Sequence, residues 1–141
     1  MKKIIVALLA AVAVVSTSFS ACAAANKPEG KVIAYYLHGT FRCYTCTMLE
    51  KYSKEAIEAG FKDALASGKL EFKAVNVEDR GNEHFVNDYQ IYTKSLVLVL
   101  FKDGKQIKWK NLDKIWEYVR NQQKFSEYVV AEVAQFLKEV Q

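Results

Sequence analysis

The chain has 141 residues, 51% of them hydrophobic, and a formal net charge of +4 at pH 7. Two of these charges belong to Lys2 and Lys3, which leaves +2 for the rest of the chain, and no block of basic residues follows. This balance argues against a nucleic-acid partner, and the length suits one domain.

The first 25 residues have the features of a secretory signal peptide. After the two lysines, residues 4–15 form one apolar run, and small residues lead up to Ala25. A run of this length is too short to cross a bilayer, which takes about 20 residues, but it fits the core of a bacterial export signal. Ordinary signal-peptidase cleavage is expected. In the alternative, a lipoprotein-type signal, Cys22 becomes the lipidated first residue.

Removal of this segment leaves a short leader, residues 26–30, and a single domain, residues 31–141. The protein is therefore expected outside the cytoplasm, either in the periplasm or anchored to the extracytoplasmic side of a membrane. Such compartments are oxidising and allow disulfides to persist. With either signal, Cys22 does not remain as a free thiol, so Cys43 and Cys46 are left as a pair.

Within the domain, the residue pattern predicts strands and helices in a clear order. Residues 31–39 are rich in β-branched and aromatic side chains and predict a buried strand. Apolar residues then recur at helical spacing from Met48 onward, although Gly60 weakens this helix, and Ser67-Gly68 ends it. Residues 69–79 predict a second strand, and Gly81-Asn82 opens a short helix.

The second half begins with the most convincing strand, residues 95–101. Asp103-Gly104 marks a tight hairpin turn, so residues 106–110 are predicted to return as the partner strand. From Leu112 onward apolar residues again recur at helical spacing. The order β-α-β-α-β-β-α predicts an α/β fold, with a mixed sheet of about four strands and helices on both faces.

This order resembles that of the thioredoxins, and the resemblance implies a thioredoxin-like fold. The first βα junction holds Cys43-Tyr44-Thr45-Cys46, at the place where thioredoxins carry their cysteines. A C-x-x-C motif alone is a weak signal, but after the first strand of a βαβ pattern it indicates a redox site.

Three uses of the Cys43–Cys46 pair compete. A structural disulfide here would close a loop of about four residues. Its restriction of the unfolded chain would stabilise the fold by only about 2 kcal/mol. A closed zinc site needs four ligands, and the only histidines, His38 and His84, are 46 residues apart. The position favours a redox-active disulfide. The alternative function is a carrier that holds a soft metal or arsenite between the two thiolates.

The surroundings of the pair predict a role for each thiol. A helix N-terminus stabilises a thiolate through its unpaired N–H groups and partial positive charge, and Arg42 adds a full positive charge next to Cys43. Cys43 is therefore assigned as the attacking thiol and Cys46, one turn into the helix, as the resolving thiol. Apart from this disulfide the sequence indicates no cofactor and no metal site. The expected partner is a thiol or disulfide that exchanges electrons with the pair.

Two features depart from the thioredoxin pattern. Thioredoxins have a cis-proline beside the cysteines, in the loop before the third strand that receives the substrate backbone; Thr93, Lys94 and Ser95 occupy this loop here and are the substrate-loop candidates. Residues 31–42 also contain no acidic residue that would serve as the buried proton acceptor. His38 is the candidate for that role, and a strand-end histidine without a catalytic part is the alternative.

Four tracts together resemble the ArsF family, described as a nitrophenyl-compound nitroreductase subunit: HGTFRCYTC, NEHF, YQIYTKS and WKNLDKIW. The resemblance extends from about Lys31 to the C-terminal helix. It implies a role in reducing aromatic nitro groups, with a membrane protein supplying electrons. Because nitro reduction normally needs a flavin or a metal, an electron-transfer subunit or thiol-disulfide oxidoreductase is expected rather than a complete nitroreductase.

Convergence of the loops as in thioredoxins would bring further side chains to the border of the dithiol. Besides His38 and Arg42, these are His84, Lys94 and Trp109. For Trp109 the alternative is packing against the sheet, and for the others it is a solvated charge.

Overall fold

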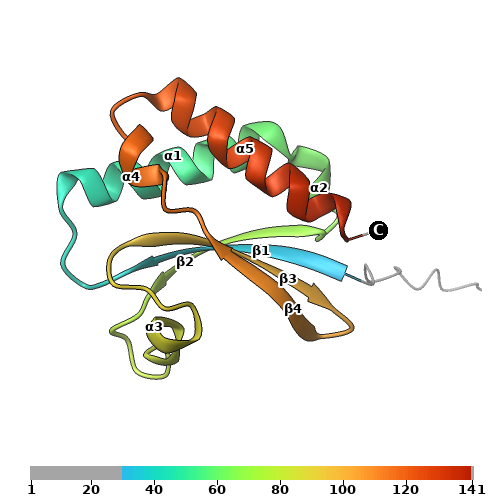
Figure 1. The fold of residues 1–141 in the computed structure, drawn as a ribbon, viewed down its shortest axis with the longest axis horizontal. Helices are drawn as coiled ribbons and strands as arrows, with labels where there is room; N and C mark the ends of the chain where they lie inside the picture. The colour runs from blue at the N-terminus through green and yellow to red at the C-terminus, as the bar shows by residue number, and fades with distance from the viewer. Residues whose placement is uncertain (1–29, 141) are drawn as a thin grey trace, which may run out of the picture.

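The structure is a computed structural model that describes residues 30–140. Its centre is a four-stranded mixed sheet with the spatial order β2-β1-β3-β4 (Figure 1). The strands are β1 (Gly30–His38), β2 (Leu70–Asn76), β3 (Ser95–Lys102) and β4 (Lys105–Asn111). β1 runs parallel to β2 and antiparallel to β3, and β4 runs antiparallel to β3. The predicted signal peptide, with Cys22, and all of the predicted leader except Gly30 lie outside the described residues.

The two central strands are buried on both faces because their side chains alternate between two separate cores. In β3, Leu96, Leu98 and Leu100 point to one core, while Val97 and Val99 point to the other. β1 divides its side chains in the same way, with Tyr36 on the first side and Leu37 on the second. This two-sided burial explains why the central strands read as continuous apolar runs.

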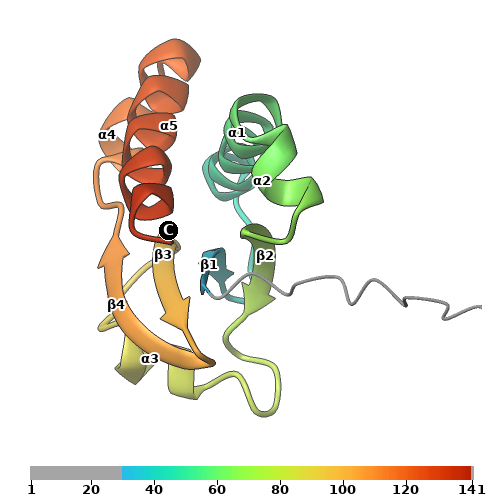
Figure 2. The same ribbon diagram turned by 90° about the vertical axis from the view of Figure 1, so that its right-hand side faces the viewer.

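The larger core lies between the sheet and four helices on one face, as Figure 2 shows. These helices are α1 (Tyr44–Gly60), α2 (Lys62–Ala66), α4 (Ile115–Tyr118) and α5 (Gln122–Lys138). The two long helices, α1 and α5, lie side by side across the sheet. Leu49 and Ile57 of α1 and Phe125 of α5 are fully buried in this layer.

The opposite face is covered by the short helix α3 (His84–Asp88) and its flanking loops. Tyr89 and Ile91 are buried there against Val97 and Val99. Tyr89 also packs edge-on against Trp109 of β4, with ring centres 5.5 Å apart. Helices therefore cover both faces of the sheet, which confirms the predicted fold class.

The observed elements differ from the predicted ones mainly at their ends. The predicted second strand, residues 69–79, is shorter, because the chain turns after Asn76. The helix predicted past Gly60 is interrupted at Phe61, whose backbone angles are not helical, and continues as α2. The helix predicted from Leu112 is likewise divided into α4 and α5. Within residues 30–140, none of the helices combines the length and apolar character needed to cross a bilayer.

Candidate functional site

Cys43 and Cys46 lie at the N-terminus of α1, just beyond the C-terminal end of β1, and form a disulfide with their Cα atoms 5.1 Å apart. Cys43 is the N-cap residue of the helix, and its Sγ accepts a hydrogen bond from the Cys46 backbone N–H at 3.2 Å. This amide is one of those that a helix leaves unpaired at its start. A thiolate at Cys43 would accept the same bond, in the field of the helix dipole.

The two cysteines differ in exposure. Cys43 is half-buried, whereas Cys46 is only 2% exposed. The carbonyl of Cys46 accepts a hydrogen bond from the hydroxyl of Tyr36 at 2.6 Å. Burial raises the pKa of Tyr36 to about 12, so its hydroxyl remains a donor at neutral pH. Tyr36 therefore ties the first turn of α1 to β1 and holds Cys46 in the interior.

Arg42 does not extend freely into solvent beside Cys43. Its Nη2 donates to the Glu50 carboxylate of α1, and its Nη1 donates to His38 Nε2 at 3.3 Å. The guanidinium also lies 5.9 Å from the centre of the Tyr36 ring. The charge that the sequence places next to Cys43 is thus held in an ion pair, and the effect of Arg42 on the Cys43 sulfur stays a prediction.

Both ring nitrogens of His38 have partners. Nδ1 lies 2.9 Å from the Gly39 carbonyl oxygen, and Nε2 faces Arg42. This pattern fits a neutral ring with its proton on Nδ1, because Nδ1 then donates and Nε2 accepts. To take up a proton at Nε2, His38 would first have to release Arg42. The role of proton acceptor predicted for His38 is therefore a proposal that requires such a movement.

Glu78, just beyond β2, holds the loop that leads to the cysteines. Its carboxylate accepts a hydrogen bond from the Thr40 backbone N–H at 3.0 Å. This bond, together with a side-chain hydrogen bond to Thr40, lowers the pKa of Glu78 below its usual value of 4.5. Asn76 reinforces the link, since its side-chain amide donates to the Thr40 hydroxyl at 3.1 Å.

The substrate-loop candidates lie at the same end of the sheet. Ser95 begins β3 beside Leu37 and is 3% exposed, with its hydroxyl donating to the Thr93 carbonyl at 2.9 Å. The Lys94 carbonyl accepts a hydrogen bond from the indole of Trp116 at 2.9 Å. The loop is therefore anchored on α4. Its suitability for receiving a substrate backbone stays a prediction.

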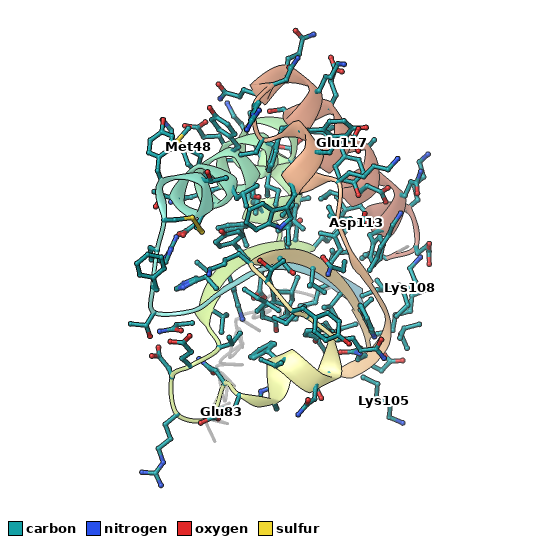
Figure 3. All side chains as sticks on the ribbon, turned by 60° about the vertical axis from the view of Figure 1, so that its left-hand side comes forward. Met48, Glu83, Lys105, Lys108, Asp113 and Glu117 are labelled. Carbon is teal, nitrogen blue, oxygen red and sulfur yellow. A yellow bond between two sulfur atoms is a disulfide. The ribbon has the colours of Figure 1, made fainter. Side chains whose placement is uncertain are left out.

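Two of the hollows that border the site lie on opposite sides of the sheet. A pocket of about 220 Å³ lies on the α3 face and a larger one of about 700 Å³ lies between α1 and α4. Figure 3 shows the disulfide as a yellow bond near the start of α1 and labels Met48 of α1 and Glu117 of α4. Both of these residues line the larger hollow. The smaller pocket is lined by His38, Gly39, Glu78, Thr93 and Lys94, together with apolar residues from β1, from the segment just after β2 and from the α3 region.

Several aromatic side chains near these hollows are exposed. Phe41 is 76% exposed and Tyr44 81%, one on each side of Cys43 in the sequence, and Tyr92 is 97% exposed at the rim of the smaller pocket. Single exposed aromatic side chains are unremarkable, but these three are all close to the cysteine pair or the loop that borders it.

His84 and Trp109 have contacts on the α3 face. His84 lies 2.7 Å from Asp88 through Nδ1 and stacks on Phe85. Trp109 packs with Tyr89 in the second core. For Trp109, this is the packing role that the sequence offered as the alternative.

Sequence reasoning missed two carboxylates at the site. Glu50 follows Cys43 by seven residues and Cys46 by four, so helical spacing places it on the face that carries the cysteines. That signal was available in the sequence. Glu78 is 35 positions beyond Cys43, and no local pattern connects it to Thr40, because the parallel pairing of β1 and β2 brings them together.

Comparison with known proteins gives structural likeness only. No protein-family model matches the chain, and no curated protein matches it. Similar solved structures include a thioredoxin of Fasciola hepatica, at 20% identity and a TM-score of 0.40, covering 69% of this chain and 86% of that one. They also include Trxlp from Edwardsiella tarda EIB202, at 13% identity and a TM-score of 0.42, covering 73% of this chain and 85% of that one. Thioredoxin f2 of Chlamydomonas reinhardtii shares 14% identity, with a TM-score of 0.37, covering 71% of this chain and 83% of that one.

The class of protein follows from the geometry of the chain itself. The β2-β1-β3-β4 order, with β2 parallel and β3 antiparallel to β1, is that of a thioredoxin-like fold. The disulfide lies at the first βα junction, where Cys43 is the N-cap residue of the long helix α1. Fold and site together define a thioredoxin-fold protein with a C-x-x-C disulfide, which supports a redox protein. The finer resemblance to the ArsF family stays a prediction.

Proposed function

We propose that this protein is an exported thiol–disulfide oxidoreductase that works by cycling Cys43–Cys46 between dithiol and disulfide. The observation that supports it best is the difference between the two sulfurs. Cys43 is the more exposed one and has a backbone donor at a helix N-terminus, while Cys46 is buried behind it. A pair built only as a staple has no need of this asymmetry.

A partner disulfide oxidises the reduced protein in two exchange steps. The Cys43 thiolate attacks one sulfur of a partner disulfide, forming a mixed disulfide and releasing the other partner sulfur as a thiolate, which takes up a proton. Cys46 loses its proton, and its thiolate attacks Cys43 Sγ, forming the Cys43–Cys46 disulfide and releasing the second partner thiolate. Two electrons pass to the partner, together with the one proton that Cys46 loses, and the second partner sulfur leaves as a thiolate. The reverse sequence of steps reduces the protein.

The resemblance of the four sequence tracts extends the proposal to a physiological role. In that role the dithiol acts as an electron carrier for the reduction of nitroaromatic compounds, with a membrane protein as its electron partner. A dithiol delivers two electrons and must then be reduced again, so a flavin or metal centre for the nitro chemistry would belong to the partner.

The test is the reduction potential of the Cys43–Cys46 couple, measured on residues 26–141 by equilibration with thiol buffers followed by alkylation. The proposal expects a value between about −120 and −270 mV, the range of working oxidoreductases. A value well below about −300 mV is typical of inert structural disulfides and would overturn the redox function.

A matched pair of variants tests the assignment of the two thiols. Cys46→Ser is expected to accumulate a mixed disulfide with a disulfide substrate, because the resolving thiol is missing. Cys43→Ser is expected to form far less, because the remaining thiol is buried. The alternative function, a soft-metal or arsenite carrier, predicts instead that the reduced protein binds one equivalent of the ion and exchanges disulfides poorly.

A further inference from the structure

A carboxylate lies in the charged cluster beside the disulfide. Glu50 of α1 pairs with Arg42, the residue before Cys43. The side chains of Arg42 and Glu50 are 30% and 27% exposed, so solvent screens this pair only in part. His38 and the ring of Tyr36 enclose the guanidinium from the side of β1.

The position of Glu50 decides where the charge of Arg42 lies. Glu50 is seven residues into α1 from Cys43, and seven residues of helix rise by about 10 Å. Arg42 precedes the helix, so its side chain must reach along α1 to meet the carboxylate. The Cys43 sulfur stays at the N-cap. The ion pair therefore holds the Arg42 side chain along α1, where it lines a pocket with Thr47, Lys51 and Lys54.

We propose that Glu50 is a positioning residue that holds Arg42 away from the Cys43 sulfur and so limits how strongly the reduced site favours the Cys43 thiolate. This inference rests on the proposed redox function. Reduction of the disulfide to one thiolate and one thiol takes up two electrons and one proton, and it creates an anion at Cys43. A guanidinium released from Glu50 is drawn to that anion.

A second observation supports a movable Arg42. Its Nε is buried and has no hydrogen-bond partner among residues 30–140, so the cluster does not satisfy the guanidinium completely. A buried donor without an acceptor is costly. The thiolate that forms at Cys43 on reduction is an acceptor of the right charge.

Other charged groups also lie around the site and contribute to the field at Cys43. They are His38 of β1, Lys51 and Lys54 of α1, Glu117 and Arg120 in and after α4, and Glu78 and Lys94 on the α3 side. None of them is altered in the variants below, so their contribution is common to all and cancels in the comparison.

The test compares the pH dependence of Cys43 alkylation in the reduced wild-type protein and in reduced Glu50→Gln. Glutamine keeps the shape and one acceptor of glutamate but removes its charge. An opposite charge within about 4–6 Å lowers the pKa of an acidic group by 1–3 units. We expect the midpoint of the profile to fall by about one pH unit, the lower end of that range, because the ion pair is partly exposed to solvent. This shift corresponds to about tenfold more Cys43 thiolate at pH values below the midpoint. It also makes the reduction potential less negative by up to about 30 mV.

Two controls separate positioning from other effects. Glu139→Gln removes a carboxylate that pairs with Lys108 and is expected to leave the midpoint unchanged. Glu139 is the C-cap residue of α5, and this end of α5 lies at the opposite end of the molecule from the start of α1 (Figure 1). Repeating Glu50→Gln in an Arg42→Gln background is expected to shift the midpoint by less than half as much, because no guanidinium is then released.

The outcomes are distinguishable from those of the redox test. No shift, an upward shift, or an equal shift in both backgrounds would overturn the positioning role. An equal shift would mean that Glu50 acts on Cys43 by its own charge alone. The measurement uses the reduced protein and needs no partner, so it can fail while the reduction potential still lies in the range of working oxidoreductases.

Discussion

Gly39 allows two loops at the end of the sheet to approach closely. A Cβ atom at this position would lie 2.5 Å from Glu78 Oε1, closer than real Cβ contacts. Because glycine has no Cβ, the Glu78 carboxylate reaches the Thr40 backbone N–H. The loop that leads from β1 to the cysteines is thereby fastened to the end of β2.

This contact predicts a pH-dependent contribution to stability. The pKa of Glu78 is lowered by its hydrogen bonds to Thr40, first of all the backbone one. A group with a lowered folded-state pKa stabilises the fold above its unfolded-state pKa and loses that contribution as the pH falls through the folded-state value. Glu78→Gln is therefore expected to be less stable than wild type at about pH 7, with the difference fading towards about pH 3.

Urea unfolding at the two pH values measures the difference, with Glu127→Gln on the exposed face of α5 as the control for loss of one carboxylate. A Glu78→Gln deficit that is the same size at low pH would show that the amide disturbs the loop by its shape. In that case, the charge on Glu78 would not be the source of the stabilisation.

At the scale of the element, the start of α5 is set by its N-cap residue, Asn121. Asn121 has extended backbone angles, and its side chain accepts a hydrogen bond from the Lys124 backbone N–H at 3.1 Å. Asparagine is among the best N-cap residues because its side-chain oxygen satisfies an amide that has no helical partner. The cap accounts for the division of the C-terminal helical segment into α4 and α5.

Asn121→Ala is expected to lower the free energy of unfolding by about 1 kcal/mol, since it leaves that amide without its acceptor. Asn121→Asp keeps the acceptor and adds a negative charge at the helix N-terminus, so it is expected to match or exceed the wild type. Chemical denaturation of the three proteins provides the comparison. Equal losses for alanine and aspartate would mean that the cap does not stabilise α5.

At the scale of the whole molecule, β1 and β3 separate the two cores. Leu98 is completely buried towards the layer of α1 and α5, while Val99, the next residue, is completely buried towards α3. The site lies at one end of the sheet, where the loop after β1 leads into α1. Its geometry therefore depends on packing from both sides of the sheet.

Leu98→Ala is expected to cost about 2–5 kcal/mol, because it leaves a cavity in the larger core. Ile107 on the edge strand β4 is 55% exposed, so Ile107→Ala removes a similar apolar side chain at a site where changes usually stay within about 0.5 kcal/mol. Thermal unfolding of both variants gives the comparison. Similar small losses would place Leu98 outside the cooperative core.

Local patterns in the sequence were sufficient to predict most elements of the fold. Apolar runs and helical spacing predicted the four strands and the helices, because these periods follow from the geometry of strands and helices. Asp103-Gly104 predicted the hairpin, and both residues have positive φ, at 51° and 75°. The resulting element order predicted the fold class, which is confirmed. The ends of β2 and the breaks at Phe61 and Asn121 were missed, since propensity changes little across such boundaries.

The partners of the site residues were decided by the tertiary structure. The sequence by itself determined that Cys43 and Cys46 begin a helix after a buried strand. It did not determine that Arg42 pairs with Glu50, that Glu78 holds Thr40, or that Trp109 packs away from the disulfide. The physical reason is that such contacts join side chains from different elements. Which of them meet depends on strand order, helix rotation and loop path together. Helical spacing places Glu50 on the face of the cysteines, but no local pattern gives the partner of its carboxylate.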